Sequence, residues 1–157
     1  MDKIDALNQV AEFHHTFKHP IEPHPVIPSP ERCRLRVNLI AEELKELEQA
    51  IRDQDIVEVA DALCDIQYVL SGAVLEFGLG EKFRQLFDEV QRSNMSKTCK
   101  TMAEAEATAK YYKEERGFDS YIRQEGNVFL VYRTTDHKTL KSINYSPADL
   151  KSILKRR

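Results

Sequence analysis

Hydrophobic residues recur at intervals of three and four along most of the first hundred positions, which is the spacing of amphipathic helices. This pattern predicts helices over residues 3–17, 30–51, 56–77 and 81–93. The two central helices carry the most regular apolar seams, which we expect to be buried. These seams consist of Val37, Ile40, Leu44, Leu47 and Ile51 in the first helix, and Ile56, Val59, Leu63, Ile66, Leu70, Val74 and Phe77 in the second.

Signals at the predicted helix ends support these boundaries. Five prolines between residues 20 and 30 exclude a helix interior and predict an extended connector. Ser29 and Pro30 are a favoured cap and first residue for the helix that follows. A turn at residues 52–54, with Asp53 or Asp55 as the next cap, would join the two central helices. Such short links favour antiparallel neighbours, so we expect a four-helix array.

The pattern changes after residue 97. Residues 101–117 predict a helix that a glycine stops, and residues 120–135 predict two strands joined by a Gly126-Asn127 turn. Ser146 and Pro147 predict a capped start for a last helix.

Length and charge then define the organisation. The chain of 157 residues suits one domain with an appendage, and we expect a mainly α fold. The prediction is a four-helix domain over residues 1–100 and a small α+β appendage, a helix plus a β-hairpin, over residues 101–157. Charge divides in a similar way, because residues 1–96 carry a net −8 and residues 97–157 a net +5.

Several classes of function become less favoured on composition. The overall net charge of −3 does not favour binding to a nucleic-acid polymer. The three cysteines have no paired spacing, which favours reduced thiols in the cytoplasm. The N-terminus lacks a signal-peptide pattern, and no run approaches 18 apolar residues, so we expect no membrane association.

Acidic side chains concentrate on the two central helices, where nine of the residues 41–65 are Asp or Glu. Glu43 and Glu46 share a helix face, and Glu58 and Asp61 repeat that spacing on the next helix. In an antiparallel hairpin both pairs would lie roughly 8–15 Å from the turn, at matching heights. Converging carboxylates raise each other's pKa, and a bound divalent cation removes this conflict. Oxygen ligands without His or Cys favour Mg²⁺ or Mn²⁺ over Zn²⁺.

Other interpretations of the acidic face stay open. Such a face is usually just solvated, and we interpret Glu48, Asp53 and Asp55 in this way. The chain could also be a non-catalytic helical interaction or regulatory protein that keeps this architecture. A di-iron carboxylate bundle is a third alternative, but its ligands usually include a Glu-x-x-His motif, which these helices lack.

The two acidic motifs resemble a known signature. Glu42-Glu43-x-x-Glu46 followed by Glu58-x-x-Asp61 is similar to the E-E-x-x-E and E-x-x-D motifs of the all-α nucleoside triphosphate pyrophosphohydrolase superfamily. Further stretches resemble its phosphoribosyl-ATP-pyrophosphohydrolase-like, MazG-like branch, and the resemblance covers about residues 7–97 and 138–151. These stretches are Phe13-His14 with Phe17, the proline-rich connector, and residues 61–68, 93–97 and 140–150. Residues 101–137 depart from the branch as an insertion, and the gap between Glu46 and Glu58 is at the short end of what it leads us to expect.

The resemblance implies a reaction and a set of residues. The reaction is hydrolysis of a nucleoside triphosphate to a monophosphate and diphosphate with Mg²⁺, as house-cleaning of non-standard or deoxyuridine-type nucleotides by a homodimer. The metal ligands would be Glu43, Glu46, Glu58 and Asp61. The catalytic residues would be Glu42, Glu43 and Glu46, with Glu42 as general base or ligand of a second ion. The candidates for substrate binding are His14, Phe17, Asp65, Tyr68, Asn94, Lys97 and Lys141.

Overall fold

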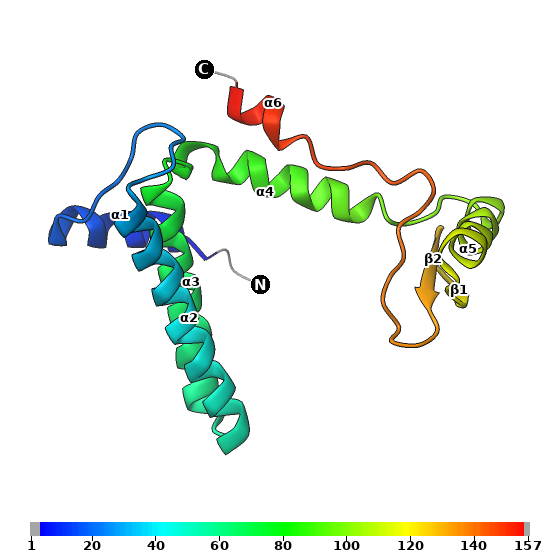
Figure 1. Cartoon of the computed structure of the whole chain (residues 1–157), viewed down its shortest axis with the longest axis horizontal. Helices are drawn as coiled ribbons and strands as arrows, with labels where there is room; N and C mark the ends of the chain where they lie inside the picture. The colour runs from blue at the N-terminus through cyan, green and yellow to red at the C-terminus, as the bar shows by residue number, and fades with distance from the viewer. Residues whose placement is uncertain (1–3, 156–157) are drawn as a thin grey trace. The chain divides into compact units, whose positions relative to one another are not determined.

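A computed structural model describes residues 4–155 of the chain (Figure 1), and within this range it contains six helices and one two-stranded sheet. The predicted mainly α fold with a small hairpin is therefore confirmed. The chain forms two compact units, Met1–Phe83 and Arg84–Arg157. The division falls within α4 (Gly80–Met95), and the predicted domain boundary at residue 100 stays a prediction.

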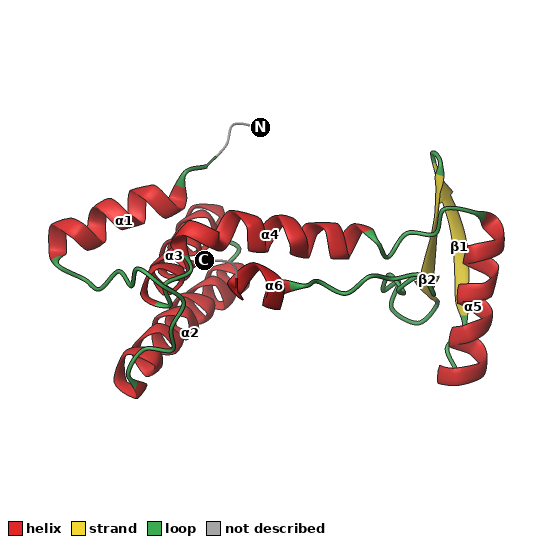
Figure 2. Ribbon diagram, turned by 90° about the horizontal axis from the view of Figure 1, so that it is seen from above, coloured by secondary structure: helices red, strands yellow, loops and turns green. Residues whose placement is uncertain are grey.

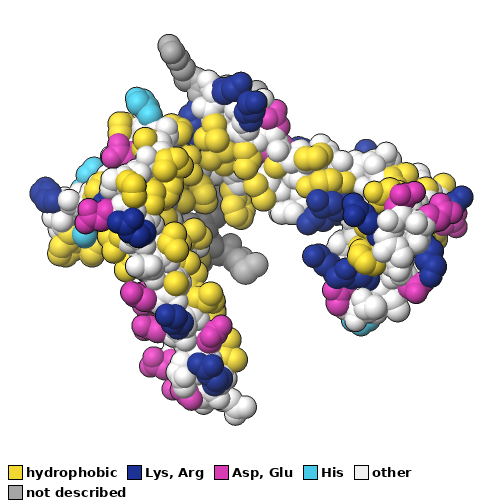
Figure 3. Space-filling model, viewed as in Figure 1, with side chains coloured by type: hydrophobic (Ala, Val, Ile, Leu, Met, Phe, Trp, Pro, Cys, Tyr) yellow, Lys and Arg dark blue, Asp and Glu magenta, His cyan; other side chains and the backbone are white. Residues whose placement is uncertain are grey.

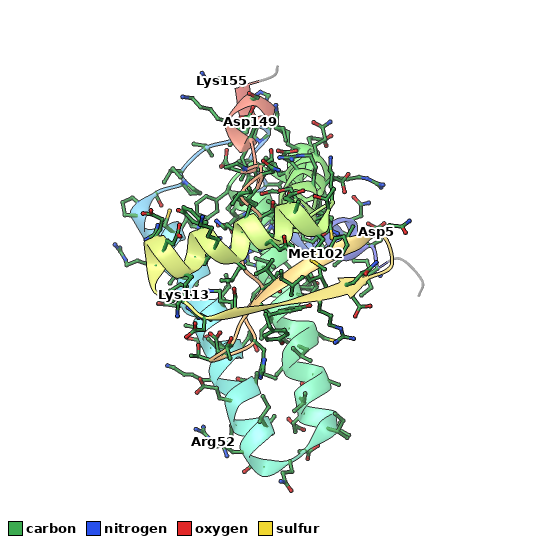
Figure 4. All side chains as sticks on the ribbon, turned by 90° about the vertical axis from the view of Figure 1, so that its right-hand side faces the viewer. Asp5, Arg52, Met102, Lys113, Asp149 and Lys155 are labelled. Carbon is green, nitrogen blue, oxygen red and sulfur yellow. The ribbon has the colours of Figure 1, made fainter. Side chains whose placement is uncertain are left out.

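The first unit contains α1 (Ala6–Phe17), α2 (Pro30–Asp53) and α3 (Ile56–Glu76). Helices α2 and α3 form an antiparallel hairpin, and α1 packs against α3. Figure 4 shows the hairpin with Arg52 labelled at its tip. These helices match the predicted ones closely, although the predicted first residue of α1, residue 3, lies outside the described residues.

The predicted caps account for the helix starts. The Ser29 hydroxyl accepts a hydrogen bond from the backbone N–H of Arg32, and Pro30 occupies the first position of α2. The Asp55 carboxylate accepts hydrogen bonds from the backbone N–H groups of Val57 and Glu58 at the start of α3. The chain therefore reverses direction at residues 54–55, at the end of the predicted turn over residues 52–54, because α2 continues through Asp53.

The end of α3 depends on a glycine. Gly78 has a φ of +65°, and a Cβ at this position would lie 1.9 Å from the carbonyl oxygen of His24. The proline-rich connector passes this close because Glu22 and Val26 donate backbone hydrogen bonds to the carbonyls of Leu75 and Phe77. The connector is thus tied to the end of α3, and only glycine fits the contact.

A buried network of charged side chains joins α1, α2 and α3. The Glu76 carboxylate on α3 is fully buried and forms ion pairs with Arg32 and Arg36 of α2. Arg36 also approaches Nε2 of His14 on α1, at 3.3 Å, while Nδ1 of His14 lies 2.9 Å from the Pro20 carbonyl oxygen. A Cβ at Gly72 would lie 2.6 Å from the Arg36 guanidinium, so glycine within α3 leaves room for the network.

The network shifts pKa values among its members, and those of Glu76 and His14 bear on stability. Burial alone would raise the pKa of Glu76, but hydrogen bonds and charge from Arg36 and Arg32 outweigh it and lower this pKa from 4.5. Burial lowers the pKa of His14 from 6.5, and the nearby Arg36 charge acts in the same direction. The folded chain therefore holds a Glu76 carboxylate and a neutral His14 imidazole over a wider pH range than the unfolded chain does.

The predicted burial of the apolar seams is wrong for half of their residues. Val37, Leu44 and Ile51 on α2 are 65%, 51% and 59% exposed, and their counterparts on α3 are similarly open. These counterparts are Ile56, Leu63 and Leu70. A helix pair covers only one side of a wide apolar stripe, so the other side stays exposed in the single chain. We call these six residues the outer seam.

The second unit packs a helix on a hairpin. Strands β1 (Ser120–Glu125) and β2 (Val128–Arg133) pair antiparallel around Gly126, and both contact α5 (Met102–Arg116), as Figure 2 shows. Met102 and Lys113 mark opposite ends of α5 in Figure 4. The core between α5 and the β-hairpin consists of Cys99, Ala105, Val131 and Leu140, with Ala109, Tyr112, Phe118, Ile122 and Phe129 packed against it.

The predicted start of the last helix is wrong. Helix α6 (Leu150–Lys155) begins after Asp149, whose carboxylate accepts a hydrogen bond from the backbone N–H of Ser152. Ser146 does not cap, because its hydroxyl accepts a hydrogen bond from Arg92 and its backbone N–H donates to Ser96. These contacts hold the segment before α6 against α4. Among the described residues, no single helix combines the length and apolar composition of a membrane span.

Replacing Glu76 with glutamine should destabilise the fold strongly. Glu76→Gln leaves the buried Arg36 and the partly exposed Arg32 without a counter-charge, and we expect the free energy of unfolding to fall by about 3–5 kcal/mol. Urea denaturation followed by circular dichroism measures this change. Glu48→Gln, on the exposed face of α2, is the control and should stay within about 0.5 kcal/mol of the parent. Equal midpoints for the two variants would contradict the role of the network.

The same network predicts a direction of pH dependence. Both lowered pKa values mean that the unfolded chain binds more protons than the folded chain. Stability should therefore fall as pH decreases below 6.5, where unfolded His14 gains its proton, and fall again below 4.5, where unfolded Glu76 does. Urea midpoints between pH 8 and pH 4 test this, and His14→Gln should flatten the upper step alone.

Candidate active site on the helical hairpin

The α2–α3 hairpin holds a pocket of about 290 Å³ near its turn. The buried Ala50 of α2 and Ala62 of α3 both line it, and such small side chains let the two helices approach closely. The rest of the lining is polar and mostly acidic: Glu46, Gln49, Asp53, Asp55, Glu58 and Asp61. No Lys, Arg or His of the described residues lines this pocket. Figure 3 shows acidic side chains gathered toward the tip of the hairpin.

The predicted acidic residues of both helices therefore come close together. Glu46 from α2 shares the pocket with Glu58 and Asp61 from α3. Two residues that sequence analysis assigned to a solvated face, Asp53 and Asp55, also line it. Asp55 is engaged as the cap of α3, and Asp53 accepts a hydrogen bond of 2.8 Å from Gln49.

Glu43 extends this acidic group away from the turn. Its carboxyl group is half-buried, and desolvation is the main cause that raises its pKa. The charges of Glu46, Asp65, Glu42 and Asp61 raise it further. Residues of both helices thus disfavour the ionised form of Glu43, which is the behaviour of a carboxylate cluster without a compensating cation.

The chemistry of these residues fits a hard divalent cation. All the candidate ligands offer carboxylate oxygens, which Mg²⁺ and Mn²⁺ prefer. Desolvation and then the neighbouring carboxylates raise the pKa of Glu43, and a bound cation would relieve the repulsion among these charges. Between residues 4 and 155, no three His, Cys, Asp or Glu side chains are arranged to hold a metal ion. The ligand set Glu43, Glu46, Glu58 and Asp61 therefore stays a prediction.

A cluster of aromatic rings lies where α1 meets α3. Phe13 is its centre, with its ring centroid 4.4 Å from that of Phe17 and 5.7 Å from that of His19. The Tyr68 ring of α3 meets Phe13 edge to face at 5.6 Å. Phe17 is 61% exposed and Tyr68 39% exposed, so both can offer a ring to a ligand. The sequence did not lead us to predict Phe13 or His19 as binding residues, although both lie within four positions of Phe17.

His14 has a different environment from these rings. It is 2% exposed, and its ring nitrogens already have neighbours, which are Arg36 of the charged network and the backbone carbonyl of Pro20. This arrangement makes His14 a link between α1 and α2. Its predicted role in substrate binding stays untested.

Three of the predicted binding residues belong to the second unit, namely Asn94, Lys97 and Lys141, whereas Asp65 lies on α3 in the first. The Lys97 ammonium donates a hydrogen bond of 2.8 Å to Oδ1 of Asn94. The Lys141 ammonium lies 4.3 Å from the centre of the Tyr145 ring. A hydrogen bond with Ser93 is the main cause that lowers the pKa of Tyr145, and the charges of Lys141 and Lys97 add to it. The Tyr145 ring therefore contacts Lys141, and its hydroxyl binds that of Ser93 on α4. The sequence did not predict these contacts, because the segment was interpreted as the start of a helix.

These observations define an all-α unit whose helical hairpin presents clustered carboxylates beside an aromatic group. The model of the family described as phosphoribosyl-ATP pyrophosphohydrolase matches residues 10–94, which is more than half of the chain. The chain belongs to this family, and with it to the all-α, MazG-like superfamily of pyrophosphohydrolases. An uncharacterized protein of Acanthamoeba polyphaga mimivirus is 23% identical over 243 aligned positions, which cover 98% of this chain and 97% of the viral protein.

Divalent cations should stabilise the chain through the acidic group. If Mg²⁺ or Mn²⁺ binds the folded hairpin only, the melting temperature should rise with its concentration. Differential scanning fluorimetry in millimolar Mg²⁺ and in EDTA measures this. Glu46→Gln and Glu58→Gln should lose the increase, whereas Glu48→Gln should keep it. Identical melting curves for the parent chain in both buffers would count against a metal site.

Proposed function

We propose that the chain is a Mg²⁺-dependent nucleoside triphosphate pyrophosphohydrolase that also accepts Mn²⁺. The observation that carries this proposal is the cluster of carboxylates that α2 and α3 bring to one pocket. No cationic side chain of the described residues lines this pocket. Family membership supports the reaction class, which is hydrolysis of a phosphoric anhydride. The proposed substrates are non-standard or deoxyuridine-type nucleotides, which the enzyme removes as house-cleaning.

Each acidic residue has a task in this reaction. Glu43, Glu46, Glu58 and Asp61 hold the cation. The cation would offset the negative charge of the substrate's phosphates and lower the pKa of the attacking water. Glu42 is exposed on α2 beside Glu43, from where it accepts the proton of that water or holds a second ion. Attack on the phosphate chain releases diphosphate and leaves a nucleoside monophosphate.

The aromatic cluster is the proposed site for the nucleoside. Phe17 and Tyr68 both pack on Phe13, so one ring fixes the positions of the other two. Their exposed surfaces suit stacking on a base. Asp65 lies one turn before Tyr68 on α3 and close enough to Glu43 to affect its charge, a position from which it can accept a hydrogen bond from a sugar hydroxyl.

We also propose that the active form is a homodimer built on the outer seam. Val37, Leu44 and Ile51 follow one another at intervals of seven residues, and the exposed residues of α3 do the same. This heptad spacing is typical of helices that pack against helices of a partner. A second copy of the hairpin supplies a matching surface, and four helices would then enclose the seams.

The reaction itself is tested by substituting the acidic residues without changing their shape. Glu46→Gln and Glu58→Gln each remove one charge from the pocket and should lower hydrolysis by at least about a hundredfold, because the cation loses a ligand. The measurement is Mg²⁺-dependent release of diphosphate from a panel of standard, modified and deoxyuridine nucleotides and phosphoribosyl-ATP. Glu48→Gln is the matched control on α2. Hydrolysis in both pocket variants at the rate of this control would refute the metal-dependent mechanism, and a flat panel for the parent chain would favour a non-catalytic interaction protein.

The dimer is tested by placing a charge in the outer seam. Leu44→Lys and Leu63→Lys should shift the chain from dimer toward monomer, because each buries an unpaired ammonium at the proposed interface. Sedimentation equilibrium over a range of concentrations measures the association. Glu48→Lys introduces a lysine on α2 outside the seam and should leave the dimer intact. A parent chain that is monomeric at all concentrations would eliminate the proposed interface.

A further inference from the structure

The second unit contains a pocket of its own, of about 490 Å³, formed by residues near the C-terminal end of α5, β2 and the segment after it. This volume lies in the range of pockets that bind small molecules. Among the residues that the structure describes, five of those lining the pocket are cationic, three are aromatic and none is acidic. The lining consists of Lys97, Tyr111, Tyr112, Arg116, Phe118, Arg133, Lys138, Thr139, Leu140 and Lys141. Figure 3 shows Lys and Arg side chains gathered on this unit.

Most of this positive charge is not compensated. Arg133 forms a bidentate pair with Asp136 and also lies over the Phe118 ring at 4.9 Å. The other four cations form no ion pair with a carboxylate within the part of the chain that the structure describes, although the charge of Asp136 also acts on Lys138; they are Lys97, Arg116, Lys138 and Lys141. Four like charges around one pocket repel one another, and an anionic ligand relieves that repulsion.

The walls of the pocket are held in place by hydrogen bonds. The Tyr112 hydroxyl accepts a hydrogen bond from the backbone N–H of Lys141, at 3.2 Å, and the Tyr112 carbonyl accepts one from Phe118. The backbone N–H of Arg133 donates to the Lys138 carbonyl at 2.9 Å. These hydrogen bonds fix the backbone from which the lining side chains project. Less conformational entropy is then lost when a ligand binds.

The aromatic side chains differ in what they offer. Tyr112 and Phe118 stack on each other with their planes 11° apart, so they support the wall. Tyr111 meets Tyr112 edge to face and is 43% exposed, so its ring has a surface left for a ligand. An exposed ring beside uncompensated cations suits a ligand that combines a flat ring with phosphate groups.

We propose that this pocket is a binding site for a nucleoside polyphosphate, with the phosphates held by Arg116, Lys138, Lys97 and Lys141 and the base stacked on Tyr111. Half of the lining comes from residues 101–137, which depart from the family resemblance, and the family match ends at residue 94. The inference does not depend on the proposed hydrolysis, because no carboxylate of the hairpin takes part. It moves Lys97 and Lys141 from the substrate site that the resemblance implies to this pocket, and it gives the insertion, through Arg116 and Tyr111, a part in binding a nucleotide without a metal ion.

Binding is measured by isothermal titration calorimetry on the full chain with a nonhydrolysable α,β-methylene nucleoside triphosphate in EDTA. Arg116→Gln and Lys138→Gln should each weaken binding about tenfold, because each removes a charged contact to phosphate. Both residues are exposed, so the fold should be unaffected. Lys110→Gln removes the same charge from α5 outside the pocket and is the matched control. Glu46→Gln should bind as the parent chain does.

Three further ligands separate the parts of the proposal. Inorganic triphosphate should bind more weakly than the nucleotide, and Tyr111→Ala should bring the nucleotide down to the level of inorganic triphosphate. The nucleoside alone should not bind measurably. A single-stranded oligonucleotide that bound more tightly per site than the nucleotide would overturn the assignment to a small ligand. No binding in EDTA, binding lost in Glu46→Gln, or equal affinities for Arg116→Gln, Lys138→Gln and Lys110→Gln would each overturn the proposed site.

Discussion

The first unit depends on the ion pairs that the buried Glu76 carboxylate forms with two arginines. An isolated ionised carboxylate inside a protein is very unfavourable, so Glu76 requires the guanidinium groups of Arg32 and Arg36 at its side. Because those arginines are one turn apart on α2, their ion pairs fix both the height and the rotation of α2 against α3. Arg36 then reaches His14, which orients α1. One end of the hairpin is held in this way and the other by the turn at residues 54–55, and the acidic pocket lies between them.

Much of this fold could be predicted from local signals. The ends of α2, α3 and the β-hairpin follow from residues that act within a few positions, such as Ser29, Asp55 and Gly126. The apolar seams show the limit of the same reasoning. Periodicity identifies which side chains avoid water, but it does not reveal whether the covering surface belongs to the same chain. Leu44 and Leu63 therefore fit the predicted pattern and yet remain exposed.

Parts of the candidate site could likewise be predicted from local spacing, whereas other parts could not. The spacing of Glu46, Glu58 and Asp61 predicted their convergence, because helix geometry converts sequence separation directly into height and direction. The roles of Ser146 and Tyr145 could not be predicted in this way. Both depend on contacts with α4 side chains about fifty positions earlier in the chain, and no local signal encodes such a contact. The start of α6 was misplaced for the same reason.

The short turn between α2 and α3 has a consequence for how the hairpin can change. Only twelve positions separate Glu46 from Glu58, and almost all of them are helical. Each residue added to or removed from a helix rotates everything beyond it by about 100°. A single deletion between these glutamates would turn one carboxylate away from the other, whereas the loss of a whole helical turn from each arm would keep their directions. The site therefore tolerates substitutions between Glu46 and Glu58 but not arbitrary changes in the length of this segment. In divergent relatives, the length of the segment should differ by whole helical turns.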